Sequence, residues 1–314
     1  MAAPRDTSRV IEVPGPWQHR YVAANGARFH VVEAVAEGTP DAPLVLLLHG
    51  FPEFWWAWRD QLPALAEAGY RAVAMDLRGY GGSDKTPRGY DPLTLARDVA
   101  GVVKALGERS AVLVGQGWGG YVGWATAALH PREVSALCAV SAPHPRVMLQ
   151  GLRTSQGWPA FGHVLSMQMP MLPERKLSDP RSGYLHRHLV RWSSPVSAFP
   201  DDDVSATYQR AFDLWPAPHC ALEYHRWLVR SRFRFDGRHF SQLMARPLAQ
   251  PVCLLRGGDD PAMPARLQAG SVSYVDGPCH SVELPGTGHF PHEEDPPAFN
   301  AALLAWLRSL EQAG

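Results

Sequence analysis

Gly117 lies at the centre of a glycine-rich turn of a kind in which many enzymes carry a nucleophile. The apolar run 111–114 predicts a strand, the segment Gly115–Gly120 a sharp turn, and the alanine-rich stretch that ends at His130 a helix. Such a turn holds its central residue in a strained conformation, with the side chain presented for attack. Because glycine has no side chain, the pattern predicts the framework of covalent catalysis without the group that would form the bond.

Two other side chains have types and positions suited to proton transfer. His289 follows the apolar run 282–284, and Asp260 follows the apolar run 252–255. Ligands of open parallel sheets bind at the carboxyl ends of the strands, so we expect both side chains there, close to Gly117. A carboxylate bonded to an imidazole fixes its tautomer and stabilises its charged form. We therefore predict His289 as a general base that is hydrogen-bonded to Asp260.

Alternating strands and helices are expected to position these residues. Besides the runs already named, strands are predicted at 44–48, 71–75 and 136–140, with a hairpin over 21–35. Helices are predicted over 54–68, 91–107 and 297–310, the second because an aspartate followed by a proline is a common helix start. The alternation favours a mostly parallel sheet of about eight strands with helices on both faces.

The alternation stops after Ser141 and resumes at 252–255. Residues 143–246 contain helical patches and no clear strand, so we predict a helical lid there, inserted into a core of residues 1–142 and 247–314. Six methionines and tryptophans of this segment either line an apolar pocket or form ordinary lid core: Met167, Met169, Met171, Trp192, Trp215 and Trp227.

The motifs together resemble the epoxide-hydrolase branch of the α/β-hydrolase superfamily over nearly the whole chain. The segments that carry the resemblance are His49-Gly50-Phe51-Pro52, Asp76–Gly81, Trp118-Gly119-Gly120, Asp260-Pro261 and Gly288-His289-Phe290. The resemblance implies an α/β-hydrolase fold, an aspartate nucleophile at the turn, a His–Asp pair that activates water, and two lid tyrosines that donate to the epoxide oxygen. Phenylalanine at position 51 favours this branch over haloalkane dehalogenases, which usually carry asparagine there.

Carried over residue by residue, the resemblance assigns the base to His289 and its acid to Asp260, with Asp259 the less favoured choice. The backbone N–H groups of Phe51 and Trp118 fit an oxyanion hole, which the loss of a nucleophilic side chain would leave in place. A tight turn that aims the first of these groups inward leads us to expect a cis Phe51-Pro52 bond.

Gly117 departs from the implied pattern, since it stands where the nucleophilic aspartate belongs, and Gln116 stands where histidine is usual. In the lid, His163 falls near the first implied tyrosine and His225 at the second, and Tyr224 is available after a shift of one residue. Each lid histidine is either a donor to the substrate or a packing residue.

Glu53 follows the oxyanion motif directly. Its carboxylate either holds a water molecule beside the oxyanion loop or caps the helix that follows.

Four functions fit these residues. The first is a hydrolase in which His289 and Asp260 activate water directly, without a covalent intermediate, on a small apolar substrate under the lid. The second is a ligand-binding protein without turnover, and the third is a non-hydrolytic proton-transfer enzyme with the same pair. The fourth, a deliberate replacement of the nucleophile, is disfavoured by Gln116 and the lid histidines. The retained pair favours the first and the third.

Composition excludes several other classes. The 314 residues carry 30 basic and 30 acidic side chains, so no basic surface for nucleic acid is expected. No apolar run is long enough for a membrane span and no signal peptide is evident, so we expect a cytoplasmic protein. We expect neither metal nor cofactor, because the cysteines lack ligand spacing. A homodimer and a monomer both remain open.

Overall fold

A single eight-stranded sheet forms the centre of the computed structural model, which describes residues 8–38, 42–151 and 158–313. The strand order is β1-β2-β4-β3-β5-β6-β7-β8. The strands are β1 (Gln18–Ala24), β2 (Ala27–Ala34), β3 (Leu44–Leu48), β4 (Arg71–Met75), β5 (Ala111–Gln116), β6 (Val134–Val140), β7 (Val252–Gly257) and β8 (Cys279–Leu284). β1 and β2 are antiparallel to their neighbours and the other pairings are parallel, which confirms the predicted fold class.

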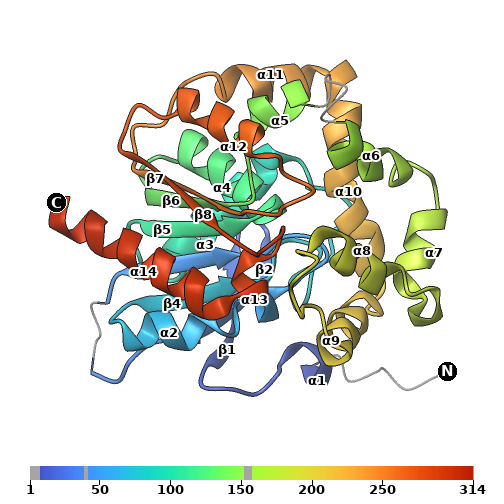
Figure 1. The fold of residues 1–314 in the computed structure, drawn as a ribbon, viewed down its shortest axis with the longest axis horizontal. Helices are drawn as coiled ribbons and strands as arrows, with labels where there is room; N and C mark the ends of the chain where they lie inside the picture. The colour runs from blue at the N-terminus through green and yellow to red at the C-terminus, as the bar shows by residue number, and fades with distance from the viewer. Residues whose placement is uncertain (1–7, 39–41, 152–157, 314) are drawn as a thin grey trace.

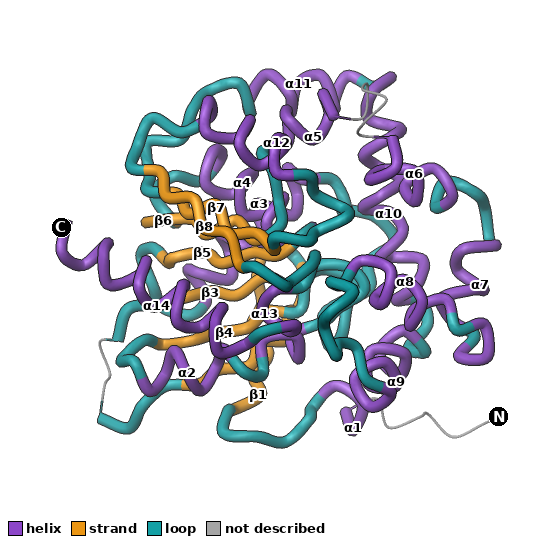
Figure 2. Tube along the Cα trace, viewed as in Figure 1, coloured by secondary structure: helices purple, strands orange, loops and turns teal. Residues whose placement is uncertain are grey.

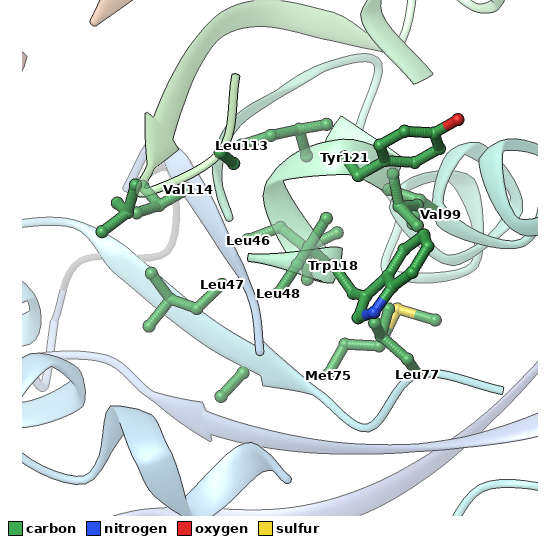
Figure 3. Close-up of a cluster of buried hydrophobic side chains, with 14 of the residues drawn as sticks. Leu46, Leu47, Leu48, Met75, Leu77, Val99, Leu113, Val114, Trp118 and Tyr121 are labelled. Atoms are coloured by element: carbon green, nitrogen blue, oxygen red, sulfur yellow. The ribbon is translucent and has the colours of Figure 1, made fainter. Parts of the chain in front are cut away.

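The central strands are buried on both faces, which explains their continuous apolar sequences. All five residues of β3 are buried. Figure 3 shows side chains of β3 and β5 in one cluster with Trp118 and Tyr121, the residues at the start of the helix that follows β5. The turn that carries Gly117 is therefore anchored to the centre of the core.

Helices cover both faces of the sheet, as Figure 2 shows. The helices of the core are α1 (Ser8–Ile11), α2 (Gln61–Glu67), α3 (Pro92–Ala105), α4 (Trp118–Leu129), α12 (Ala265–Gly270), α13 (Pro291–Glu294) and α14 (Pro296–Ala313), with 3-10 turns η1 (Trp55–Trp58) and η4 (Ser271–Tyr274). α3 begins as predicted, because Asp91 accepts a hydrogen bond from the Thr94 N–H at 3.0 Å. The helix predicted over 54–68 is instead η1 followed by α2, because Pro63 is tolerated only in the first turn of an α-helix.

Between β6 and β7 the described residues form helices and no strand of the sheet. They are α5 (Pro145–Gly151), α6 (Trp158–Ser166), α7 (Leu172–Ser178), α8 (Tyr184–Trp192), α9 (Asp202–Phe212), α10 (Ala217–Arg230) and α11 (Phe235–Leu243), with 3-10 turns η2 (Pro180–Ser182) and η3 (Ser231–Phe233). Helices α6 to α10 gather at one end of the sheet in Figure 1. Residues 152–157 of the predicted lid lie outside the described residues, and its boundaries at 143 and 246 stay predictions. No described helix is long and apolar enough to cross a membrane.

Candidate active site

The turn between β5 and α4 places Gly117 at the carboxyl edge of the sheet. Its backbone has φ 51° and ψ −114°, a conformation that favours glycine. The Gly117 N–H donates to the Val140 carbonyl at 3.0 Å, and its own carbonyl accepts from the Tyr121 N–H at 3.0 Å. Gly117 is the N-cap of α4, and no side chain caps this helix.

The room available for a Cβ atom distinguishes Gly117 from the other glycines of the turn. A Cβ at Gly115 would lie 2.5 Å from backbone atoms of Gly119, and a Cβ at Gly119 only 2.1 Å from the Leu48 carbonyl oxygen. Glycine is required at both positions, because the strand and the helix pack backbone against backbone. A Cβ at Gly117 would meet His289 Nε2 at 3.5 Å and Gly50 Cα at 3.8 Å, which are ordinary contact distances. At position 117 the backbone conformation favours glycine, but the packing leaves room for a side chain.

His289 and Asp260 are brought together beside this space. The His289 Nδ1 and Asp260 Oδ2 atoms are 3.0 Å apart, and both residues are buried. The other carboxylate oxygen, Oδ1, accepts from the backbone N–H groups of Ala262 and Met263 at 2.8 and 2.9 Å. An ionised Asp260 favours the tautomer of His289 with its proton on Nδ1. The other ring nitrogen, Nε2, faces Gly117, 3.5 Å from the position of a Cβ on that residue. The Asp259 carboxylate instead accepts from the Ser194 hydroxyl at 2.8 Å.

The loop that carries His289 is held from several sides. The backbone N–H of His289 donates to the Trp192 carbonyl at 2.8 Å, and the His289 carbonyl accepts from the Gln116 side-chain amide at 2.9 Å. The Glu294 carboxylate accepts from the backbone N–H groups of Gly288 and Phe290 at 2.8 and 3.0 Å. Gln116, to which the sequence assigned no role, thus ties the turn at Gly117 to the loop that carries His289.

The loop after β3 carries the proposed oxyanion residue Phe51, and the Phe51-Pro52 bond is cis, as expected. Glu53 supports this loop from behind: its Oε2 accepts from the Gly50 N–H at 2.9 Å, and its Oε1 lies 3.3 Å from His292 Nε2. Burial alone would raise the pKa of Glu53, but His292 and the Gly50 N–H outweigh burial and lower the pKa below its usual value. Glu53 does not cap η1, and the structure does not bring it to the cavity.

A cavity of about 40 Å³ lies above Gly117. At about 10–15 Å³ for each water-sized occupant, it has room for about three. Its wall is mostly apolar and includes the predicted residues Phe51, Trp118, His163, His225 and His289. The remaining lining residues are Gly117, Tyr121, Ala142, Pro143, Met148, Val164, Trp192 and Met263.

His225 reaches the cavity with both ring nitrogens already engaged. Its Nε2 accepts from the Trp118 indole N–H at 2.9 Å, and its Nδ1 lies 3.2 Å from the Ala221 carbonyl oxygen. Burial lowers the pKa of His225 to about 4, so the ring is neutral at pH 7 and its one N–H points at Ala221. Tyr224 is not brought to the cavity, because its hydroxyl donates to the Arg78 carbonyl at 2.7 Å.

A surface groove of about 780 Å³ adjoins the cavity, and His163 and Trp192 line both spaces. Their rings are in edge contact, with centroids 4.5 Å apart. Sequence reasoning missed His188, which lies in this wall: it is buried, burial lowers its pKa to about 3, and its Nε2 has no hydrogen-bond partner among the described residues. The helical spacing of Leu185, His188, Leu189 and Trp192 was the available signal, because it places His188 on the buried face of α8.

Comparison with known proteins identifies the family to which this fold belongs. The model of the α/β hydrolase fold family matches residues 43–296. Epoxide hydrolase A of Mycobacterium tuberculosis is 32% identical, over 93% of this chain and 98% of its own length, and epoxide hydrolase 3 of Xenopus tropicalis is 32% identical over 93% and 78%. The crystal structure of epoxide hydrolase A from Mycobacterium thermoresistibile superposes with a TM-score of 0.77 at 28% identity, covering 93% of this chain and 98% of that one. An epoxide hydrolase from an endophytic Streptomyces gives 0.80 at 28%, covering 95% and 97%. The chain belongs to the α/β-hydrolase family, in its epoxide-hydrolase branch.

Proposed function

We propose that this chain is a hydrolase in which His289 and Asp260 activate water directly, because the nucleophile position of the fold is occupied by Gly117. One distance carries the proposal: His289 Nε2 lies 3.5 Å from the point where a Cβ of residue 117 would stand. In the covalent mechanism that the family resemblance implies, a side chain would fill this space. Here the space admits a water molecule within reach of the base.

The remaining groups supply enough catalysis for a reactive substrate. General-base assistance contributes about 10²–10⁴-fold, and one oxyanion donor about 10²–10³-fold. In the proposal, the oxyanion donors are the backbone N–H groups of Phe51 and Trp118, two residues that line the cavity. The substrate is small and mostly apolar, in keeping with the size and the walls of that cavity.

The state of His225 bears on the substrate class. Opening an epoxide leaves an alkoxide that needs a proton donor from the lid, and the N–H of His225 is directed to Ala221 instead. A carbonyl substrate needs only backbone donors for its oxyanion. The state of His225 therefore favours a small ester over an epoxide.

Binding without turnover is the second candidate function, and the same observation favours it. With both nitrogens of His225 engaged and no side chain at Gly117, two groups of the covalent mechanism are missing. Proton transfer without hydrolysis is the third candidate, and it depends on the same pair, His289 and Asp260.

Turnover of small esters and epoxides by the wild-type protein and by His289→Gln tests the proposal. We expect the wild-type protein to hydrolyse such a substrate and the rate to fall about 10²–10⁴-fold in His289→Gln. His280→Gln, at an exposed histidine, is the matched control and should keep the wild-type rate. Intact-mass spectrometry should detect no covalent adduct during turnover. An adduct on an acidic residue of the pocket would refute direct water activation. Equal hydrolysis rates in the wild type and His289→Gln would instead favour the second candidate function, binding without turnover. Solvent deuterium exchange into a substrate that is not hydrolysed would identify proton transfer.

A further inference from the structure

We propose that the space at Gly117 is a binding site for a short-chain monocarboxylate of the size of formate or acetate. The bound carboxylate takes the place of the side-chain carboxylate that position 117 lacks. The inference rests on the proposed function only in taking residue 117 as the vacant nucleophile position. Binding is measured without turnover, so the two proposals can fail separately.

The first support is the size of the space. A Cβ at residue 117 would have its nearest neighbours at 3.5 and 3.8 Å, so a group larger than hydrogen fits there without movement. The cavity of about 40 Å³ extends from this point. It has room for about three water-sized occupants. Formate has three non-hydrogen atoms and acetate has four, whereas butyrate requires the lid to move.

The second support is the start of α4. This helix has 12 residues, and its N-cap, Gly117, provides no side chain to accept from the first backbone N–H groups. The first N–H groups of a helix lack partners within the helix, and together with the helix dipole they favour an anion. One carboxylate oxygen at position 117 would accept from these groups.

The third support is His289, which points to the same space from the opposite side. Its side chain is 3% exposed, and its Nε2 has no hydrogen-bond partner among the described residues. In the protonated form, Nε2–H donates to the second carboxylate oxygen, while Asp260 at Nδ1 stabilises the positive ring.

The charges that surround His289 permit this arrangement. The acidic groups near it are Asp260, which is bonded to its ring, and Glu294, whose carboxylate is satisfied by backbone N–H groups. His188 and His225 are neutral at pH 7, because burial lowers their pKa values to about 3 and about 4. No acidic side chain lines the cavity in the part of the chain that the structure describes.

The rest of the cavity suits a short hydrocarbon group. Met148, Val164 and Met263 form apolar walls beyond the dyad. A carboxylate with its head at His289 would place its methyl group against these side chains. The ligand class is therefore a monocarboxylate, which is also the acid product of hydrolysing a short acyl ester.

Titration of the wild-type protein with ¹³C-acetate, followed by NMR at constant ionic strength set with chloride, tests this site. We expect one saturable site in the submillimolar to millimolar range, since so few ligand atoms support no higher affinity. Acetamide, the neutral analogue, should bind at least tenfold more weakly. Gly117→Asp should weaken acetate binding at least tenfold, because its own carboxylate fills the space.

Gly107→Asp is the matched control for Gly117→Asp, because Gly107 also has a positive φ (89°) but is exposed, and a Cβ added there would have no neighbouring atom within 4 Å. This variant should bind acetate like the wild type. His289→Gln, which leaves the space open, should weaken acetate binding at least tenfold. This variant tests the site if Gly117→Asp does not fold. Absence of saturable binding up to 50 mM, equal binding of acetamide, or wild-type affinity in folded Gly117→Asp or in His289→Gln would each overturn the proposal.

Discussion

Alanine should be tolerated far better at position 117 than at position 119, although both glycines belong to one turn. At Gly117 the new Cβ would make ordinary contacts, so the cost is the backbone strain at φ 51°, about 1–3 kcal/mol. Alanine also lowers the conformational entropy of the unfolded chain, which raises the unfolding free energy by about 0.4–1 kcal/mol. The net loss of unfolding free energy is therefore about 0–2.5 kcal/mol.

At Gly119 the new Cβ would lie 2.1 Å from the Leu48 carbonyl oxygen and 2.6 Å from that of His49. Both are backbone atoms at the end of β3, so the strand and α4 must move apart. We expect a loss of more than about 3 kcal/mol, at or beyond the upper end of overpacking costs.

Urea unfolding followed by circular dichroism, with a common slope for all variants, measures the difference. Gly107→Ala is the control for strain alone, since Gly107 has φ 89° in an exposed turn with nothing within 4 Å of a new Cβ. If Gly117→Ala loses as much stability as Gly119→Ala, residue 117 is a packed glycine, and the reasoning that treats it as a vacant nucleophile position is wrong.

Three further predictions concern the site and its lid. Gly117→Asp should gain slow epoxide hydrolysis, with an ester intermediate detected by intact-mass spectrometry. Adding His225→Tyr should raise the rate, because His225 has no N–H free to donate. A folded but inactive Gly117→Asp variant would instead favour binding without turnover. Stability should fall as the pH drops below about 6.5, because burial lowers the folded-state pKa of His144 and His188 to about 3 and of His225 to about 4, so the unfolded chain binds more protons. Each of these three histidines should contribute a loss of about 1.4 kcal/mol of unfolding free energy at pH 5.5, about 4 kcal/mol from the three together. Equal urea midpoints at pH 7.5 and 5.5 would contradict this prediction. Trp192→Ala should join the 40 Å³ cavity to the 780 Å³ groove, so that butyrate binds as well as acetate in the NMR titration; unchanged exclusion of butyrate would show that Trp192 is not the barrier.

The central strands of the sheet could be predicted from the sequence because they are covered on both faces. Burial on both faces makes a strand continuously apolar, and β3 and β4 begin and end at the residues that their apolar runs indicated. The contact between His289 and Asp260 could also be predicted, since both follow parallel strands whose carboxyl ends meet at one edge.

The lid could not be predicted to the same depth. Helical spacing shows which residues of α8 and α10 are buried, but not which neighbour each one meets. His225 accepts a hydrogen bond at Nε2 from the indole of Trp118, which is 107 positions away in the sequence. The Tyr224 hydroxyl donates to the Arg78 carbonyl of the core. Such contacts depend on how the lid packs on the core, which no local pattern contains.

The room around Gly117 also has an evolutionary consequence. A glycine codon that ends in a pyrimidine becomes an aspartate codon by one base change, and the packing at this position does not oppose the new side chain. Under the proposed function, the donor state of His225 would keep the resulting turnover slow. A single base change at residue 117 would therefore give selection only a weak new activity to act on.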